Sequence, residues 1–218
     1  MPEKGVAKKK RDQNVYDRLV FVWLFAASLL GLCAAWCHQT FAEDGAGASM
    51  KDHVLFDFAA DENAWRSIND GVMGGISSGR MRMLETTAVF EGNLSLENNG
   101  GFASVRSGAL DSDLDGFTGF RVRIRGDGKR YQFRAHTSGA FDGPSYLCTF
   151  DTRKDEWQEI ALPFSKFEAS FRGRALPDFP ALKPDEIVTL GILIANEQEG
   201  DFHLELDWIR AYMLDTGQ

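Results

Sequence analysis

Apolar and polar residues alternate along most of the chain after His53. The stretch "DFHLELDWI" (201–209) places an apolar residue at every second position, and "FRVRIRG" (120–126) shows the same period. Successive side chains of a β-strand point to opposite faces, so this period is typical of strands with one buried face. "EIVTLGILIA" (186–195) is almost entirely apolar and predicts a strand that is buried on both faces. Such strands, separated by turns rich in Gly, Asn and Asp, predict an all-β sandwich.

Two of the alternating stretches, "FRVRIR" and "YQFRAH", are separated by a short segment that contains "GDGK". This arrangement predicts a β-hairpin with one apolar face and one polar face. The polar face would carry a local basic patch, which has two interpretations. Its cations pair with Asp and Glu on neighbouring strands, or they form a recognition surface for an anionic or polar ligand. The residues concerned are Arg121, Arg123, Arg125, Arg134 and His136, with Lys129 and Arg130 at the turn.

The first 18 residues contain six Lys and Arg, and an uncharged run then extends from Leu19 to Cys37. The run is close to the ~20 apolar residues that span a bilayer as a helix. "TFA" at 40–42 also resembles a signal-peptidase site, so both a cleaved signal and a retained anchor fit. Either predicts a body outside the cytoplasm, membrane-anchored or periplasmic and exported. The expected organisation is a basic N-region (1–18), a signal sequence or transmembrane helix (19–42), a tether (43–52), a β-sandwich (53–213) and a tail (214–218).

Charge and motif content exclude several classes of function. The formal net charge of −8 argues against a nucleic-acid binder, which is normally basic. The four histidines lack zinc-ligand spacing and no serine lies in a nucleophile elbow, so neither an enzyme, a metal nor a cofactor is expected. "DSDLDG" (111–116) begins like a calcium loop, but its twelfth position is Val122 instead of Glu. A solvated acidic turn is favoured there, and a weak, irregular calcium site stays open.

The stretch "NDGVMGGISSGR" (69–80) contains four glycines. It lacks the Lys and Ser/Thr that a phosphate-binding loop requires after its last glycine, so a nucleotide site is rejected. We expect a turn in which Gly74 and Gly75 permit backbone conformations or close approaches that a side chain would forbid. A second glycine pair lies in "ENNGGFASVR" (97–106), and we expect the two loops to lie together at one end of the sandwich. The candidate binding residues are Asn69, Asp70, Gly71, Gly74, Gly75, Arg106, Arg121, Arg123, Arg134 and His136.

The body resembles the complex I intermediate-associated protein 30 family. The matching segments, in order, are "INDGVMGGISSG", "FEGNLSLENNGGFASVRS", "GFRVRIRGDGKRYQF", "WQEIALPFSKF", "FRGRAL" and "LELDWI". The resemblance implies a galactose-binding-like jelly-roll β-sandwich. Mitochondrial members of the family assist assembly of respiratory NADH:ubiquinone oxidoreductase, and the family is not known as a set of enzymes. It offers no established catalytic residues to carry over.

Together these features predict a non-enzymatic binding or accessory module at the cell envelope that resembles an assembly factor. Its partner would be a protein, such as a subunit of a membrane complex, and the N-terminal segment would contact the membrane. The alternative is a carbohydrate- or small-ligand-binding module, because the jelly roll is also the fold of carbohydrate-binding modules. That alternative needs an exposed aromatic platform, for which Trp65 and Trp157 are candidates, although either residue could equally be part of the core.

Overall fold

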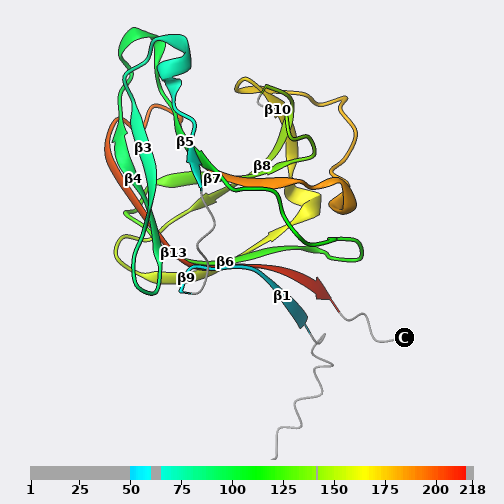
Figure 1. The fold of residues 1–218 in the computed structure, drawn as a ribbon. Coiled ribbons are helices and arrows are strands. Elements are labelled where there is room, and N and C mark those ends of the chain that lie inside the picture. The colour runs from blue at the N-terminus through cyan, green and yellow to red at the C-terminus, as the bar shows by residue number, and fades with distance from the viewer. Residues whose placement is uncertain (1–49, 60–64, 141, 215–218) are drawn as a thin grey trace, which may run out of the picture. The chain divides into compact units, whose positions relative to one another are not determined.

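A computed structural model describes residues 50–59, 65–140 and 142–214, and all of them belong to one compact unit, Ala46–Gln218. The expected N-terminal helix and the C-terminal tail lie outside the described residues. The described part of the chain forms an all-β sandwich of two antiparallel sheets (Figure 1). Sheet A has the order β3-β4-β13-β6-β9, with β1 also paired to β13, and sheet B has the order β11-β10-β8-β7-β12-β5-β2.

The strand bounds are as follows. Sheet A contains β1 (Met50–Asp57), β3 (Ser78–Met83), β4 (Ala88–Leu94), β6 (Gly119–Arg125), β9 (Trp157–Pro163) and β13 (Gly200–Leu214). Sheet B contains β2 (Arg66–Ser67), β5 (Ala103–Arg106), β7 (Arg130–His136), β8 (Ser145–Asp151), β10 (Glu168–Phe171), β11 (Arg174–Ala175) and β12 (Thr189–Ile194). Four short 3-10 helices connect them, η1 (Asp70–Met73), η2 (Glu97–Asn99), η3 (Phe164–Lys166) and η4 (Pro184–Glu186).

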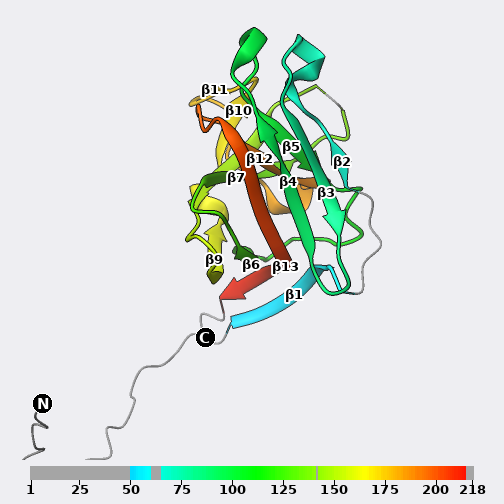
Figure 2. The same ribbon diagram turned by 90° about the vertical axis from the view of Figure 1, so that its left-hand side faces the viewer.

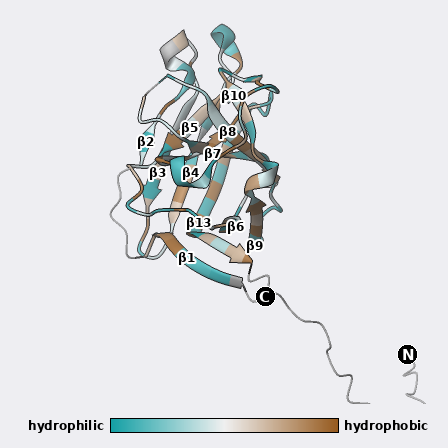
Figure 3. Cartoon of the chain, turned by 90° about the vertical axis from the view of Figure 1, so that its right-hand side faces the viewer, coloured by the Kyte–Doolittle hydropathy of each residue, from teal (hydrophilic) through white to brown (hydrophobic). Residues whose placement is uncertain are grey.

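The apolar residues of the alternating stretches form the core between the two sheets. Tyr131, Phe90, Phe120 and Phe133 are its largest fully buried side chains. The rings of Phe120 and Phe133 come from opposite sheets and their centroids are 5.1 Å apart, so the core joins the two layers directly. Hydrophobic and hydrophilic segments alternate along the strands, as Figure 3 shows. Every residue of β12 is buried, which confirms the strand that the apolar run predicted.

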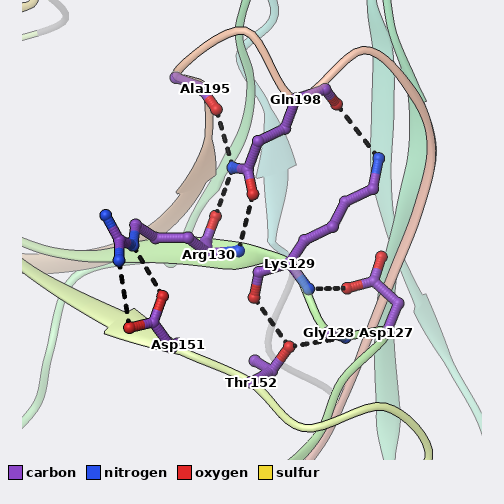
Figure 4. Close-up of polar contacts among 8 residues, drawn as sticks. All are labelled: Asp127, Gly128, Lys129, Arg130, Asp151, Thr152, Ala195 and Gln198. Carbon is purple, nitrogen blue, oxygen red and sulfur yellow. Dashed lines mark hydrogen bonds and ion pairs between the residues drawn. The ribbon is translucent and has the colours of Figure 1, made fainter.

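The predicted hairpin between "FRVRIR" and "YQFRAH" is wrong. β6 pairs with β13 and β9 in sheet A, whereas β7 pairs with β8 and β12 in sheet B. The segment 126–129 is therefore a crossing between the layers, and Figure 4 shows the contacts that Thr152 and Gln198 make with it and with Arg130. Asp127 accepts hydrogen bonds from the hydroxyl of Tyr131 (3.1 Å) and the backbone N–H of His203 (2.9 Å), and Thr152 donates to the carbonyl of Lys129 (2.8 Å).

This crossing also contacts the loop before β13. The side chain of Gln198 accepts a hydrogen bond from the N–H of Arg130 (2.8 Å) and donates to the Arg130 carbonyl (2.7 Å), as Figure 4 shows. Lys129 donates from its ammonium group to the Gln198 carbonyl (3.1 Å). The pairing of β6 within sheet A and of β7 within sheet B places the arginines of the two strands on different sheets.

Candidate functional site

The carboxylate of Asp70 joins the two glycine-rich loops. It is fully buried and accepts hydrogen bonds from the backbone N–H of Ser77 (3.0 Å), the Ser77 hydroxyl (2.5 Å) and the N–H groups of Gly101 (2.7 Å) and Phe102 (3.3 Å). Burial by itself raises the pKa of Asp70, but the hydrogen bonds from Ser77, Gly101 and Phe102 outweigh it and hold that pKa below its ordinary value. The two loops therefore lie together, as expected, and η1 and η2 stand at the same end of the sandwich (Figure 2).

Glycines of both loops are required here, one for its backbone conformation and two for their close approach to this carboxylate. Gly74 ends η1 with φ of +92°, a left-handed conformation that favours glycine. A Cβ atom at Gly75 would lie 2.4 Å from Cγ of Asp70, and one at Gly100 would lie 2.7 Å from Oδ2 of the same residue. The loop motif thus forms a buried internal contact. The candidate binding residues Asp70 and Gly75 take part in this contact, and Gly74 provides the left-handed turn beside it.

Asn69 is also engaged internally, although it borders a surface hollow. Its side chain donates to the Gly79 carbonyl (3.1 Å) and accepts from the Ser104 N–H (3.3 Å). The hollow has a volume of about 930 Å³ and carries charges of both signs. Within it Arg80 pairs with Glu91, and Asp127 and Asp201 also line it, so the hollow is acidic on balance.

On the outer face of sheet A, the arginines of β6 have acidic partners. Arg121 contacts Asp52 (2.8 Å) and Glu159 (2.5 Å), Arg123 pairs with Asp207, and Arg125 pairs with Glu205 (2.5 Å). The guanidinium groups of Arg123 and Arg125 also lie over the ring of Trp157. The interpretation of this part of the patch as cross-strand pairing is confirmed, and its positive charge is largely compensated.

On the outer face of sheet B, the structure shows no acidic partner, within the described residues, for a row of arginines. Gly191 of β12 is directly opposite Arg106 of β5 on one side and Arg134 of β7 on the other, and Arg66 of β2 is directly opposite Arg106. Among the described residues, the structure shows only neutral partners for Arg106 and Arg134. The backbone carbonyl of Ala140 (3.3 Å) and Nδ1 of His136 (3.3 Å) face Arg106, and Gln132 (2.9 Å) and Ser145 (3.3 Å) accept from Arg134.

Burial and mutual repulsion act on the protonation of this cluster. Burial, followed by the charge of Arg66, lowers the pKa of Arg106, and burial together with Arg106 lowers the pKa of Arg134 to about 10. Arginine side chains stay protonated in proteins, so both guanidinium groups are charged at neutral pH. Burial, then Arg106 and Arg134, lower the pKa of His136 to about 3, so its ring is neutral and its Nδ1 can accept the hydrogen bond from Arg106.

The depressed pKa of His136 makes the stability of the domain depend on pH. Below about pH 6.5 the unfolded chain protonates this histidine whereas the folded chain does not, so stability falls as the pH decreases toward 3. We expect the free energy of unfolding to fall by about 2 kcal/mol from this group between pH 7 and pH 5. Urea unfolding at pH 7, 6 and 5 measures it. His136→Gln should lose this part of the slope and His53→Gln, at an exposed position, should keep it; equal slopes in all three proteins would contradict the assignment.

The two tryptophans that the carbohydrate alternative requires are both partly buried by neighbouring side chains. Trp65 packs against the core, with ring centroids 5.2 Å from Phe56 and 6.0 Å from Phe58. Trp157 lies under Arg123 and Arg125. Neither ring is a free stacking platform for a sugar. In the described part of the chain, which includes the acidic turn 111–116, no group of three or more His, Cys, Asp or Glu side chains could hold a metal ion.

Arg66 and Gly191 were not predicted from the sequence as neighbours of Arg106 and Arg134. The first lies in a two-residue strand and the second in an apolar run, and only the pairing of β2, β5, β12 and β7 brings them into one row. Arg106, Arg134 and His136 were predicted as candidates, and the structure brings these three together. Arg121 and Arg123, which were predicted beside them, lie on the other sheet.

Comparisons with known proteins agree with this architecture. Residues 54–206 match the model of the family described as complex I intermediate-associated protein 30. The mitochondrial protein of that name from mouse is 28% identical over 173 residues, which cover 70% of this chain and 53% of the mouse protein. A probable counterpart from Caenorhabditis elegans is 28% identical over 145 residues, covering 58% of this chain and 43% of that protein. The chain spans about half the length of these curated relatives.

The fold is also shared with solved carbohydrate-binding modules. A family 11 module of a cellulosomal cellulase from Clostridium thermocellum superposes with a TM-score of 0.58 and 21% identity, covering 75% of this chain and 95% of the module. Identity at this level shows the fold alone, a sandwich of the jelly-roll type.

The expectation of an exported or membrane-anchored body is wrong. The relatives from mouse and C. elegans are named as mitochondrial proteins, which contradicts a periplasmic or envelope location. The uncharged run Leu19–Cys37, on which the expectation was based, lies outside the described residues. Within the residues that are described, no helix is long and apolar enough to cross a membrane.

Proposed function

This chain belongs to the complex I intermediate-associated protein 30 family, and from that membership we propose that its body, residues 53–213, is a non-enzymatic binding module for complex I assembly. Its partner would be a subunit of respiratory NADH:ubiquinone oxidoreductase or of an assembly intermediate of that complex. The names of the mouse and C. elegans relatives support this role for the shared part of the chain.

One observation supports the assignment of the binding face. Sheet A compensates the arginines of β6 with carboxylates, whereas Arg106 and Arg134 on sheet B have only neutral partners among the described residues. Like charges on directly opposite residues destabilise a sheet, so the pair formed by Arg66 and Arg106 lowers the stability of the fold. The chain has a net charge of −8 and therefore many carboxylates that could relieve this repulsion. Among the described residues, however, none of them pairs with Arg106 or Arg134. We assign the uncompensated face to partner binding, because electrostatic complementarity at an interface gives specificity and speeds association.

Affinity capture of the tagged full-length chain from its own cells tests the proposal. Subunits of the NADH:ubiquinone oxidoreductase should co-purify, and the double variant Arg106→Glu/Arg134→Glu should reduce their recovery by about tenfold or more. Arg82→Glu/Arg153→Glu makes the same change in charge at exposed positions and should leave recovery unchanged. Recovery of no oxidoreductase subunit, or equal losses in both double variants, would refute the proposed role or the proposed face.

A further inference from the structure

Neutral groups around Arg106 and Arg134 accept hydrogen bonds from each guanidinium group without neutralising its charge. Gln132 accepts from Nε (3.3 Å) and Nη2 (2.9 Å) of Arg134, and the Ser145 hydroxyl accepts from Nη1 (3.3 Å). A guanidinium group has five N–H donors. Among the described residues, Arg134 thus keeps one unpaired N–H on each terminal nitrogen, which is the pair of donors that a carboxylate bridges.

Arg106 is held in the same manner. Its Nη1 donates to the Ala140 carbonyl and its Nη2 donates to Nδ1 of His136, both at 3.3 Å. His136 is buried and neutral, so it orients the guanidinium group and contributes no negative charge. In the part of the chain that is described, Arg106 therefore retains three of its five donors for another group.

The spacing of the two arginines favours an extended ligand over a small ion. They flank β12, and two strand spacings of about 4.8 Å separate their positions in the sheet by about 10 Å. Gly191 lies between them, and the ring of His136, instead of a side chain at 191, occupies part of the interval. A Cβ atom at this glycine would already contact Cβ of Arg134 at 3.6 Å and Nε2 of His136 at 3.5 Å. Several acidic side chains on one peptide match this row of cations, which Arg66 continues at the sheet edge.

We propose that Arg106 and Arg134 form a carboxylate-binding site on the outer face of sheet B whose occupant is an acidic peptide segment of a partner protein. This inference rests on the proposed function, because it specifies the chemistry of the segment that the same face binds. Planar guanidinium forks bind carboxylates bidentately, and such charge-assisted bonds are stronger than neutral ones. The arginines of sheet A cannot serve in the same way, because Asp52, Asp207 and Glu205 already engage them.

Fluorescence anisotropy of a labelled hexaglutamate peptide with the full-length chain tests the site. Arg106→Gln and Arg134→Gln should each weaken binding by about tenfold or more, whereas Arg82→Gln, on sheet A, should bind like the unchanged protein. A hexaglutamine peptide should not bind, and raised NaCl should weaken hexaglutamate binding because salt screens exposed charges. Equal binding by all three variants would overturn the proposal. Tighter binding of a phosphoserine peptide of equal charge would overturn the assignment to carboxylates.

Thermal unfolding of the same variants separates binding from a structural role. Removing one charge from a repelling row should leave the melting temperature unchanged or raise it. A marked decrease in both Arg106→Gln and Arg134→Gln would show that these side chains serve the fold instead. The peptide assay contains no oxidoreductase subunit, so peptide binding without subunit capture would refute the proposed function alone. Capture without peptide binding would refute only the carboxylate site.

Discussion

Replacing Asp70 with alanine is expected to lower the free energy of unfolding by about 3–6 kcal/mol, a large part of the total for a domain of this size. The substitution removes one acceptor that serves four hydrogen bonds, from the Ser77 N–H, the Ser77 hydroxyl and the N–H groups of Gly101 and Phe102. Buried donors that lose their acceptor cost about 1–3 kcal/mol each, although such costs do not simply add. Both glycine-rich loops would lose their common contact.

Urea unfolding of the variant measures this effect, with Asp178→Ala as the control because Asp178 is exposed. The control should change stability by no more than about 0.5 kcal/mol. The lowered pKa of Asp70 adds an acid test. Its contribution is present above the ordinary value of 3.8 and is lost as the pH falls through the lower pKa of the folded state. If Asp70→Ala unfolds at the same urea concentration as the unchanged protein, the carboxylate does not hold the loops together.

Gly75→Ala should cost about 2–3 kcal/mol, whereas Gly71→Ala in the same loop should be nearly neutral. The new methyl group at 75 would lie 2.4 Å from Cγ and 2.5 Å from Oδ1 of Asp70. The carboxylate cannot move away without breaking its bonds to Ser77 and Gly101. At Gly71 nothing lies within 4 Å of an added Cβ and the backbone is not left-handed.

Thermal unfolding of the two alanine variants gives the comparison directly. A decrease in melting temperature that is larger for Gly75→Ala than for Gly71→Ala supports close approach as the reason for the glycine-dense loop. Equal melting temperatures would mean that Asp70 can shift, and that the requirement for glycine at position 75 is conformational or absent.

Much of the fold follows from the alternation of apolar and polar residues. The inner residues Phe120, Val122 and Ile124 and the fully buried β12 are where the pattern predicted them. Alternation reports which face of a strand is buried, but it does not report which strand is the neighbour. Strands that follow each other in sequence are normally read as a hairpin, and for this reason the crossing at 126–129 was missed.

The candidate site shows the same limit. Arginines at alternate positions of β6 and β7 look alike in sequence, yet Glu205 and Asp207 come from the distant strand β13 and compensate only those of β6. The pairing of β2 with β5 and of β12 with β7 places Arg66 and Gly191 beside Arg106 and Arg134. A basic face could therefore be predicted from the residues, whereas its division into a compensated and an uncompensated half depends on strands far apart in the chain.

Site-specific photo-crosslinking tests most directly whether the outer face of sheet B binds the partner. A photoreactive amino acid is placed at Thr149, an exposed residue of β8 on the outer face of sheet B, or at Ala161, an exposed residue of β9 on sheet A. After capture from cells and illumination, an oxidoreductase subunit should be linked to the chain with the label at 149 and not to the chain with the label at 161. Crosslinks from 161 alone would place the partner on sheet A and contradict the account.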